Sequence, residues 1–467
     1  MSTTAAPSPA AATSLERSAL LVATLTSFLG PFMISSVNVA LPAIQADLDL
    51  TAVQLSWVAT SYLLAVAVVL LPAGKIADIH GRKKVFTAGL AVYTLASTMA
   101  AFADSAAGLL VFRACQGIGA GLFVTTGMAI LTSIFPPHKR GRAIGIYVAA
   151  VYVGLSVGPF AGGALIQQFG WRSIFLVMLP LGIGAIAITL TFLRGEWADG
   201  PGQRLDVAGS LIYSVAILAL VYGASILPST SGAALAAAGL AGLVLFFRQQ
   251  QRTAHPLFEV ALFTANRTFA FSSLAALLNY SSTFAVTLLM SLYLQYLKGM
   301  PPRNAGMLLM VQPMVMALFS PVAGRLSDRI EPRLLASTGM AITVVGMLVF
   351  SRLHPDSGLV GIGCNLVLIG FGFALFSSPN MSAIMGSVAK EHYGLASGVV
   401  ATMRLMGQMM SMAIAMVVLS LLVGHETIGP ANFDRFLQSI RTVFLISALL
   451  CSTGVFFSLG RGRLRQP

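Results

Sequence analysis

The sequence predicts an all-α integral membrane protein, and three observations carry this prediction. Of the 467 residues, 57% are hydrophobic and only 9% are charged, whereas a soluble domain is about one quarter charged. Apolar runs long enough to cross a hydrocarbon core of about 30 Å recur along the whole chain. A charged turn near residue 78 also returns in altered form near residue 328, which indicates that one bundle of helices was duplicated.

Fourteen spanning helices are expected from the apolar runs. In order, they cover residues 18–41, 54–76, 84–103, 107–134, 141–166, 173–193, 206–226, 232–248, 268–297, 304–324, 333–352, 358–380, 394–423 and 438–460. The seventh and eighth are the weakest, because the eighth is rich in Ala and Gly and only a short loop separates the two. We interpret them as a hairpin inserted between two six-helix bundles. Without this pair twelve helices would remain with the same sidedness, and the length of the chain favours fourteen.

These helices divide the chain into five segments. Residues 1–16 are rich in Ala, Ser, Thr and Pro and predict a disordered cytoplasmic tail. A first six-helix bundle is expected over 17–195, a linker with the inserted helix pair over 196–267, and a second six-helix bundle over 268–460. Residues 461–467 form a basic cytoplasmic tail.

The charges predict the orientation. With both termini in the cytoplasm, the inner loops and tails hold 20 of the 28 Lys and Arg residues, and the outer loops hold 6. This bias is the one that cytoplasmic loops of inner-membrane proteins show, so the net charge of +13 reflects topology and not a nucleic-acid partner. The three cysteines lie singly in apolar segments, and the six histidines form no ligand pair. No disulfide, metal or cofactor is therefore expected.

The repeated turn predicts a gate at the cytoplasmic side. Its first copy reads Gly74-Lys-Ile-Ala-Asp78-Ile-His-Gly81-Arg82-Lys83, and its second copy keeps Gly324, Asp328 and Arg329 but replaces the last glycine by Glu331-Pro332. A carboxylate in such a turn can face the N-terminus of a neighbouring helix, and the basic residues can pair with the opposite bundle when the cytoplasmic side is closed. We expect the first copy to dominate. The alternative is an ordinary basic loop, which would need neither Gly nor Asp at fixed spacing.

The fifth expected helix carries a glycine face. Gly154, Gly158 and Gly162 recur every four residues, so they form one face on which another helix can approach closely in lipid. Pro159 removes a backbone hydrogen bond and bends the helix, and Gly163 completes the segment. A plain packing seam is the alternative interpretation.

Two arginines, Arg113 and Arg404, are embedded in expected helices, and a charge at membrane depth normally faces the bundle interior. Arg404 lies near the middle of its helix with Gln408 one turn later, so it is the best single candidate for a site residue. Arg113 is nearer a helix end, where it could instead extend to the interface. The expected substrate cavity comprises Asn38, Arg113, Gln116, Asn279, Tyr280, Gln312, Asn365, Arg404 and Gln408. For each uncharged member, interhelical packing is the alternative.

Together with Val37-Asn-Val-Ala-Leu-Pro42 and Tyr293-Leu-Gln295, these motifs resemble the major facilitator superfamily, and within it the fourteen-helix drug:proton antiporter branch. The resemblance runs from about residue 28 to about residue 412. It implies alternating access between two bundles and export of small molecules driven by the proton gradient. In that family the glycine and proline segment of the fifth helix marks antiporters. No catalytic cluster or nucleotide-binding motif is visible, so neither an enzyme nor an ATP-driven pump is expected.

The chain departs from that branch at Met33, where the family usually carries Asp. All fifteen acidic residues fall in loops, tails or loop-end motifs, so a buried proton carrier is missing, and Asp78, Asp47 and Asp49 are the remaining candidates. Two embedded arginines without an embedded acid predict an electropositive cavity that prefers neutral or anionic solutes over cations. A permease for an organic anion or an antibiotic intermediate, without conventional proton antiport, is therefore the alternative function. The expected partners are a small-molecule substrate, the lipid bilayer and protons, and we expect a monomer.

Overall fold

The computed structural model describes residues 9–193, 195–198, 205–253, 256–257, 263, 266–327, 329–388, 393–424 and 426–462. Within these ranges all the regular elements are helices, which confirms the predicted all-α class. The predicted disordered tail is already helical from Pro9, and residues 1–8 lie outside the described ranges, as do 463–467 of the basic tail.

The first bundle consists of α1 (Pro9–Leu48), α2 (Ala52–His80), α3 (Arg82–Ala101), α4 (Ala106–Ile134), α5 (Pro137–Phe169), the short α6 (Ser173–Leu176) and α7 (Met178–Phe192). The inserted pair is α8 (Val207–Ser225) and α9 (Thr230–Gln250). The second bundle contains α11 (Arg267–Thr283), α12 (Ala285–Leu292), the π-helix η1 (Tyr293–Leu297), α13 (Pro302–Leu309), α14 (Val311–Ser327), α15 (Pro332–Phe350), α16 (Leu359–Gly386), α17 (Tyr393–Leu422), η3 (Pro430–Asn432) and α18 (Phe433–Gly460).

Thirteen helical segments of the described chain are long and apolar enough to cross a membrane. The remaining predicted span is α3, which has 20 residues but begins with three cations, Arg82-Lys83-Lys84, and is therefore less apolar. Besides the break between α6 and α7 at Val177, two expected single helices of the second bundle are interrupted, since α11 passes into α12 at Phe284 and α13 passes into α14 at Met310. Both breaks lie beside the cavity described below.

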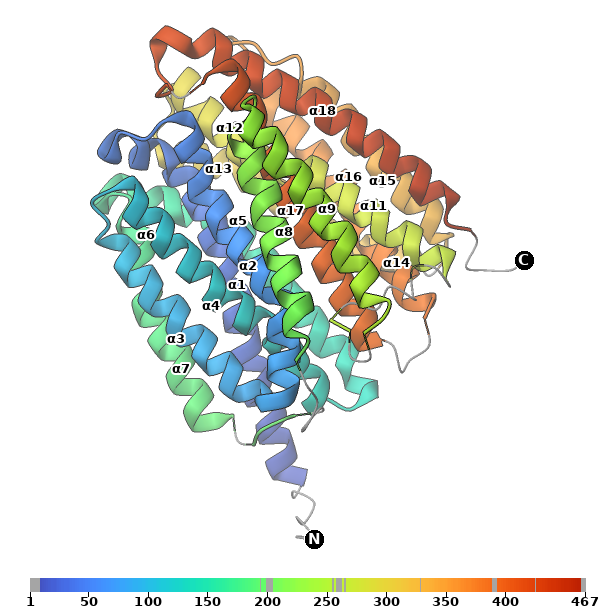
Figure 1. Ribbon diagram of the computed structural model, residues 1–467. Coiled ribbons are helices and arrows are strands. Elements are labelled where there is room, and N and C mark those ends of the chain that lie inside the picture. Colours follow the sequence, from blue (N-terminus) through green and yellow to red (C-terminus); the bar gives the residue numbers. More distant parts are fainter. Residues whose placement is uncertain are drawn as a thin grey trace.

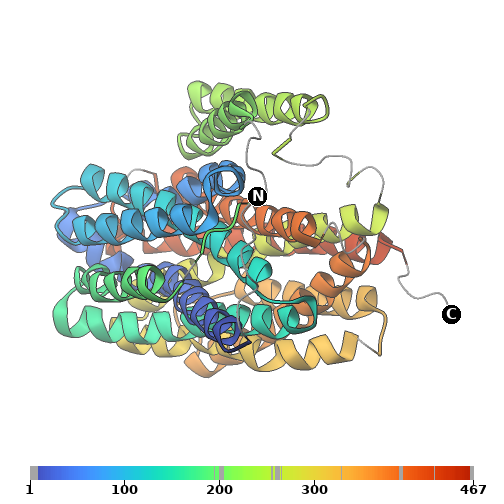
Figure 2. The same cartoon turned by 90° about the horizontal axis from the view of Figure 1, so that it is seen from below.

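The two bundles stand side by side, and the inserted pair packs outside them (Figure 1). Seen from below, α8 and α9 form a separate layer against one flank of the molecule (Figure 2). The pair is bonded to both bundles: the Tyr213 hydroxyl donates to the Ala67 carbonyl of α2, and the Ser420 hydroxyl of α17 donates to the Leu227 carbonyl. The insertion therefore spans the junction between the bundles.

The glycine face of α5 packs against α1. A Cβ atom on Gly154 would lie 2.6 Å from the Phe28 carbonyl oxygen, and one on Gly162 would lie 2.7 Å from the Ser36 Cβ. A Cβ on Gly158 would collide with the Ser35 hydroxyl. The close approach lets Ser36 donate to the Gly158 carbonyl over 2.9 Å. The seam therefore combines backbone contact with a hydrogen bond from one helix to the other.

We expect Gly158→Ala to lower the free energy of unfolding by about 1–3 kcal/mol, because overpacking forces the two helices apart. Gly145→Ala is the matched control, since Gly145 is an exposed residue of the same helix and no heavy atom lies within 4 Å of its added Cβ. Thermal unfolding of both purified variants in detergent checks this expectation. Equal midpoints for the two variants would contradict the proposed tightness of the seam.

Candidate functional site

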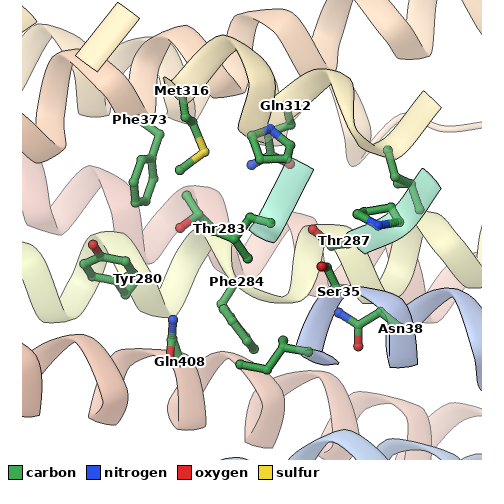
Figure 3. A pocket seen from close by; sticks show the side chains of 15 residues that line it. Ser35, Asn38, Tyr280, Thr283, Phe284, Thr287, Gln312, Met316, Phe373 and Gln408 are labelled. Carbon is green, nitrogen blue, oxygen red and sulfur yellow. The ribbon is translucent and has the colours of Figure 1, made fainter. Parts of the chain in front are cut away.

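A cavity of about 100 Å³ lies between the two bundles, lined by residues of α1 and α5 on one side and of α11 to α14, α16 and α17 on the other. Figure 3 shows the polar side chains that reach it from both halves of the chain. They are two carboxamides of the second bundle, one carboxamide of the first, and four hydroxyl groups: Gln312, Gln408, Asn38, Ser35, Tyr280, Thr283 and Thr287.

The remaining lining is apolar and aromatic. Phe284, Phe373 and Met316 border the cavity, and the rings of Tyr280 and Phe373 meet edge to face at 5.3 Å. None of the described residues that line the cavity carries a charge. The cavity lining therefore combines apolar and aromatic surface with a few uncharged hydrogen-bonding groups.

Asn38 offers the cavity an unused hydrogen-bond acceptor. Its Oδ1 atom is buried and has no hydrogen-bond partner, although the side chain borders the cavity. A buried acceptor without a partner costs about 1–3 kcal/mol, so a solute that donates a hydrogen bond here would recover that free energy.

The structure places Arg113 and Gln116 elsewhere than the sequence predicts. Arg113 is fully buried inside the first bundle, where its Nε donates to the Val58 carbonyl over 2.9 Å and its guanidinium lies 4.5 Å from the centre of the Tyr62 ring. It also donates to Gln116, which in turn donates to Ser97 over 2.6 Å. Arg113 therefore neither lines the cavity nor extends to the interface, because α2, α3 and α4 satisfy it internally.

Two predicted asparagines and Arg404 also lie outside the lining. Asn365 donates to the Gly346 carbonyl over 2.9 Å, and Asn279 is buried in α11 with both amide atoms unpartnered. Arg404 stands one turn before Gln408 in α17, and its side chain interacts with the Tyr280 hydroxyl. Arg404 therefore does not line the cavity itself but interacts with Tyr280, which does. Met33 is fully buried in the core.

The first copy of the charged turn is an ion-paired cluster where α2 ends and α3 begins. Arg82 donates to a single Asp78 oxygen from Nη2 over 2.8 Å and from Nε over 3.1 Å, and it also donates to Ser133 of α4. Asp78 lies in the last turn of α2, so it pairs with the start of α3. In the second copy, a Cβ on Gly324 would lie 2.8 Å from the Ser378 hydroxyl, and Arg329 follows α14 in a turn. Asp328 lies outside the described residues.

At the opposite end, the bundles are joined by a seal that the sequence interpretation missed. Pro42 has no N–H group, so the Asn38 carbonyl of α1 loses its helical partner. Ser291 of α12 donates to that carbonyl over 2.7 Å, and Gln295 of η1 donates to the Val39 carbonyl over 2.9 Å. Pro42 and Gln295 both belong to motifs noted in the sequence. The spacing of residues along the chain does not show that these two motifs lie against each other across the bundles.

The seal continues on both sides of these bonds. Tyr296 donates to the Gln45 side chain, and the Ala52 N–H donates to the Glu426 carbonyl over 2.9 Å. On α5, a Cβ on Gly163 would lie 2.5 Å from the Pro302 carbonyl oxygen, so this glycine faces α13 of the other bundle and not α1. The ends of the bundles that lie opposite the charged turn are therefore in backbone contact.

Comparisons with known proteins agree on one family. A model described as Major Facilitator Superfamily matches residues 23–412 and 272–465. The chain is 33% identical to multidrug resistance protein Stp of Mycobacterium tuberculosis (strain ATCC 25618 / H37Rv), over 84% of this chain and 75% of that protein. It is 34% identical to the cephamycin export protein CmcT of Amycolatopsis lactamdurans, over 87% and 85%. It is 29% identical to the riboflavin transporter RibZ of Clostridioides difficile (strain 630), over 82% and 84%.

A solved structure has the same fold. The bacterial homologue of the human lysosomal transporter Spinster, in an inward-facing and unoccupied conformation, superposes with a TM-score of 0.68. The match covers 98% of both chains at 18% sequence identity.

We expect Ser291→Ala combined with Gln295→Ala to weaken the seal, because the first change leaves the buried Asn38 carbonyl unpaired at about 1–3 kcal/mol and the second removes the other hydrogen bond between the bundles. A cysteine placed at Thr287 in the cavity should then react faster with a membrane-impermeant thiol reagent added from the extracellular side. Ser281→Ala is the control, since that hydroxyl donates to the Leu277 carbonyl of its own helix. If the double variant reacts no faster than this control, the two bonds do not hold the seal.

Proposed function

Since the chain belongs to the major facilitator superfamily, we propose that this transporter exports small molecules from the cytoplasm by alternating access, with protons as the coupling ion. The observation that carries the proposal is the cavity between the two bundles, with a hydrogen-bonded seal at one end and an ion-paired turn at the other. A solute bound there can leave on either side only if the two ends open in turn.

Export is favoured over uptake by the local structure of α5. Gly158 packs on α1, while the Pro159 carbonyl contacts Gly306 of α13, so this segment wedges between elements of both bundles. In the family that the motifs resemble, this glycine and proline segment marks antiporters, which is the basis for proposing export. Relatives named for export include the tetracenomycin C resistance and export protein of Streptomyces glaucescens, which is 31% identical. Both termini are proposed to lie in the cytoplasm of an inner membrane, from the bias of Lys and Arg.

Asp78 is the proposed proton carrier. None of the described residues lining the cavity is acidic, and Asp47 is held at the extracellular end by Arg172 over 2.5 Å and by Trp171 over 3.1 Å. Asp78 instead pairs with Arg82 at the cytoplasmic turn, where protonation would cancel the attraction and release the turn. Binding and loss of one proton would thereby open and close the cytoplasmic gate.

The proposed substrates are uncharged solutes with hydrogen-bonding groups and an aromatic part. The three carboxamides each present a donor and an acceptor, and Phe284 and Phe373 supply apolar surface. An organic anion is the second candidate, because Arg404 interacts with Tyr280 at the edge of the cavity.

We expect everted membrane vesicles to accumulate riboflavin only while a proton gradient is present, and collapse of the gradient by an ionophore should abolish accumulation. Asp78→Asn should lower the initial rate at least about tenfold, since it removes the charge partner of Arg82. Asp104→Asn is the control, because Asp104 is an exposed residue of the extracellular side. Gradient-driven transport by Asp78→Asn at the wild-type rate would exclude Asp78 as carrier and gate.

A charge placed in the cavity should change its selectivity. Gln312→Glu and Gln408→Glu are nearly isosteric, so we expect each to favour ethidium over riboflavin by roughly tenfold relative to the unmodified protein. Gln167→Glu, at an exposed position of α5, is the matched control. Competition among riboflavin, which is neutral, ethidium, which is a cation, and a cephamycin, which is an anion, compares transport of the three charge classes. A preference of the unmodified protein for the cephamycin would favour the organic-anion alternative, and a preference for ethidium would contradict both.

A further inference from the structure

The turn between α2 and α3 is held by a segment that follows the last helix of the first bundle. The Glu196 carboxylate accepts a hydrogen bond from the Lys83 N–H over 2.7 Å, and the Trp197 carbonyl accepts one from the Arg82 N–H over 2.8 Å. Gly81, between the two helices, has φ +109°, and a Cβ there would lie 2.5 Å from the Glu196 Cδ. Glu196 thus occupies the space that a side chain at position 81 would need.

The chemistry of this turn requires an external carboxylate. α3 begins with Arg82, Lys83 and Lys84, and cations are disfavoured at a helix N-terminus, where the helix dipole is positive. Gly81, as the N-cap residue, has no side chain that could accept a hydrogen bond from the first N–H groups. Glu196 supplies both the acceptor and the negative charge. It also fixes the backbone from which Arg82 reaches Asp78 and Ser133.

The second copy of the turn has a corresponding arrangement with the charges exchanged. Glu331 is the N-cap residue of α15, at the position that corresponds to Gly81, and Pro332 corresponds to Arg82 but has no N–H group to satisfy. Arg461 follows α18 as Glu196 follows α7, and it interacts electrostatically with Glu331.

Arg461 is fixed in that place by the second bundle. It is buried, and its Nη1 donates to the Asn380 Oδ1 over 2.7 Å and to Ser272 over 3.2 Å. Its carbonyl accepts a hydrogen bond from Thr268 over 2.8 Å. In the first half the Glu196 carboxylate is thus hydrogen-bonded to the charged turn, whereas in the second half the corresponding residues, Glu331 and Arg461, interact electrostatically.

We propose that Glu196 is a positioning residue of the cytoplasmic gate, which acts through the Lys83 N–H to hold Arg82 against Asp78. The inference rests on the proposed role of Asp78 and Arg82 as that gate. Loss of the Glu196 carboxylate should loosen the start of α3, so that the cytoplasmic side closes less often. The effect should appear in the balance between the two conformations and not only in the amount of folded protein.

The test uses the full-length protein with its three cysteines replaced by serine and a reporter cysteine at Thr287. Glu196→Ala should raise the ratio of cytoplasmic to extracellular labelling of the reporter about fivefold, the effect of losing one helix cap. Glu196→Gln, which keeps the acceptor oxygen and loses the charge, should give a smaller shift in the same direction. Glu16→Ala is the matched control, because Glu16 is another cytoplasmic carboxylate, paired with Lys139 over 3.0 Å, and should leave the ratio unchanged.

Labelling is normalised to the folded protein recovered by size-exclusion chromatography, so a loss of folding alone does not change the ratio. Asp78→Asn is measured in parallel. If Asp78→Asn shifts the ratio and both Glu196 variants do not, the positioning role of Glu196 is wrong and the gate stands. If Asp78→Asn also leaves the ratio unchanged, the gate itself is wrong, and the proposal for Glu196 falls with it.

Discussion

In hydrocarbon, each backbone carbonyl and N–H group must find a partner inside the protein, because no water is present to replace one. Proline in a spanning helix breaks this rule locally, since it leaves the carbonyl four residues earlier without its N–H donor. In α1, Pro42 does this to Asn38, and the partner comes from Ser291 of the other bundle. At the junction of the two bundles, the second bundle thus pairs a backbone carbonyl for which the first bundle has no donor. Since the same Asn38 presents an unpaired carboxamide oxygen to the cavity, one residue borders both the cavity and the seal.

Much of the fold could be predicted because it depends on one strong signal, the length of apolar runs. The all-α membrane class and the inserted pair follow from that signal alone. The breaks at Phe284 and Met310 do not, because residues on both sides are equally apolar and tertiary packing decides where a helix bends. The glycine face of α5 was predictable since a period of four defines one side of a helix. No partner could be assigned to Gly163, because sequence cannot say which of two bundles a residue at the end of that face will meet.

The site was predictable only in part. Asn38, Tyr280, Gln312 and Gln408 border the cavity as expected, since polar residues at membrane depth tend to face the interior. The same rule led us to place Arg113 in the cavity, but a charged side chain can equally face the interior of a single bundle. Its charge is met by a carbonyl, an amide and an aromatic ring, none of which is conspicuous in sequence. Glu196 escaped notice because it lies in a loop more than a hundred residues from Lys83, and only the fold brings them together.

The inserted pair is bonded to α2 through Tyr213 and to α17 through Leu227, which are helices of different bundles. Two rigid bodies that rock against each other cannot both keep a fixed distance to a third. In the proposed alternating-access cycle the hairpin therefore moves with one bundle and slides along the other. Its exposed surface would then move through the surrounding bilayer, so the thickness and viscosity of the membrane would enter the rate of the proposed cycle.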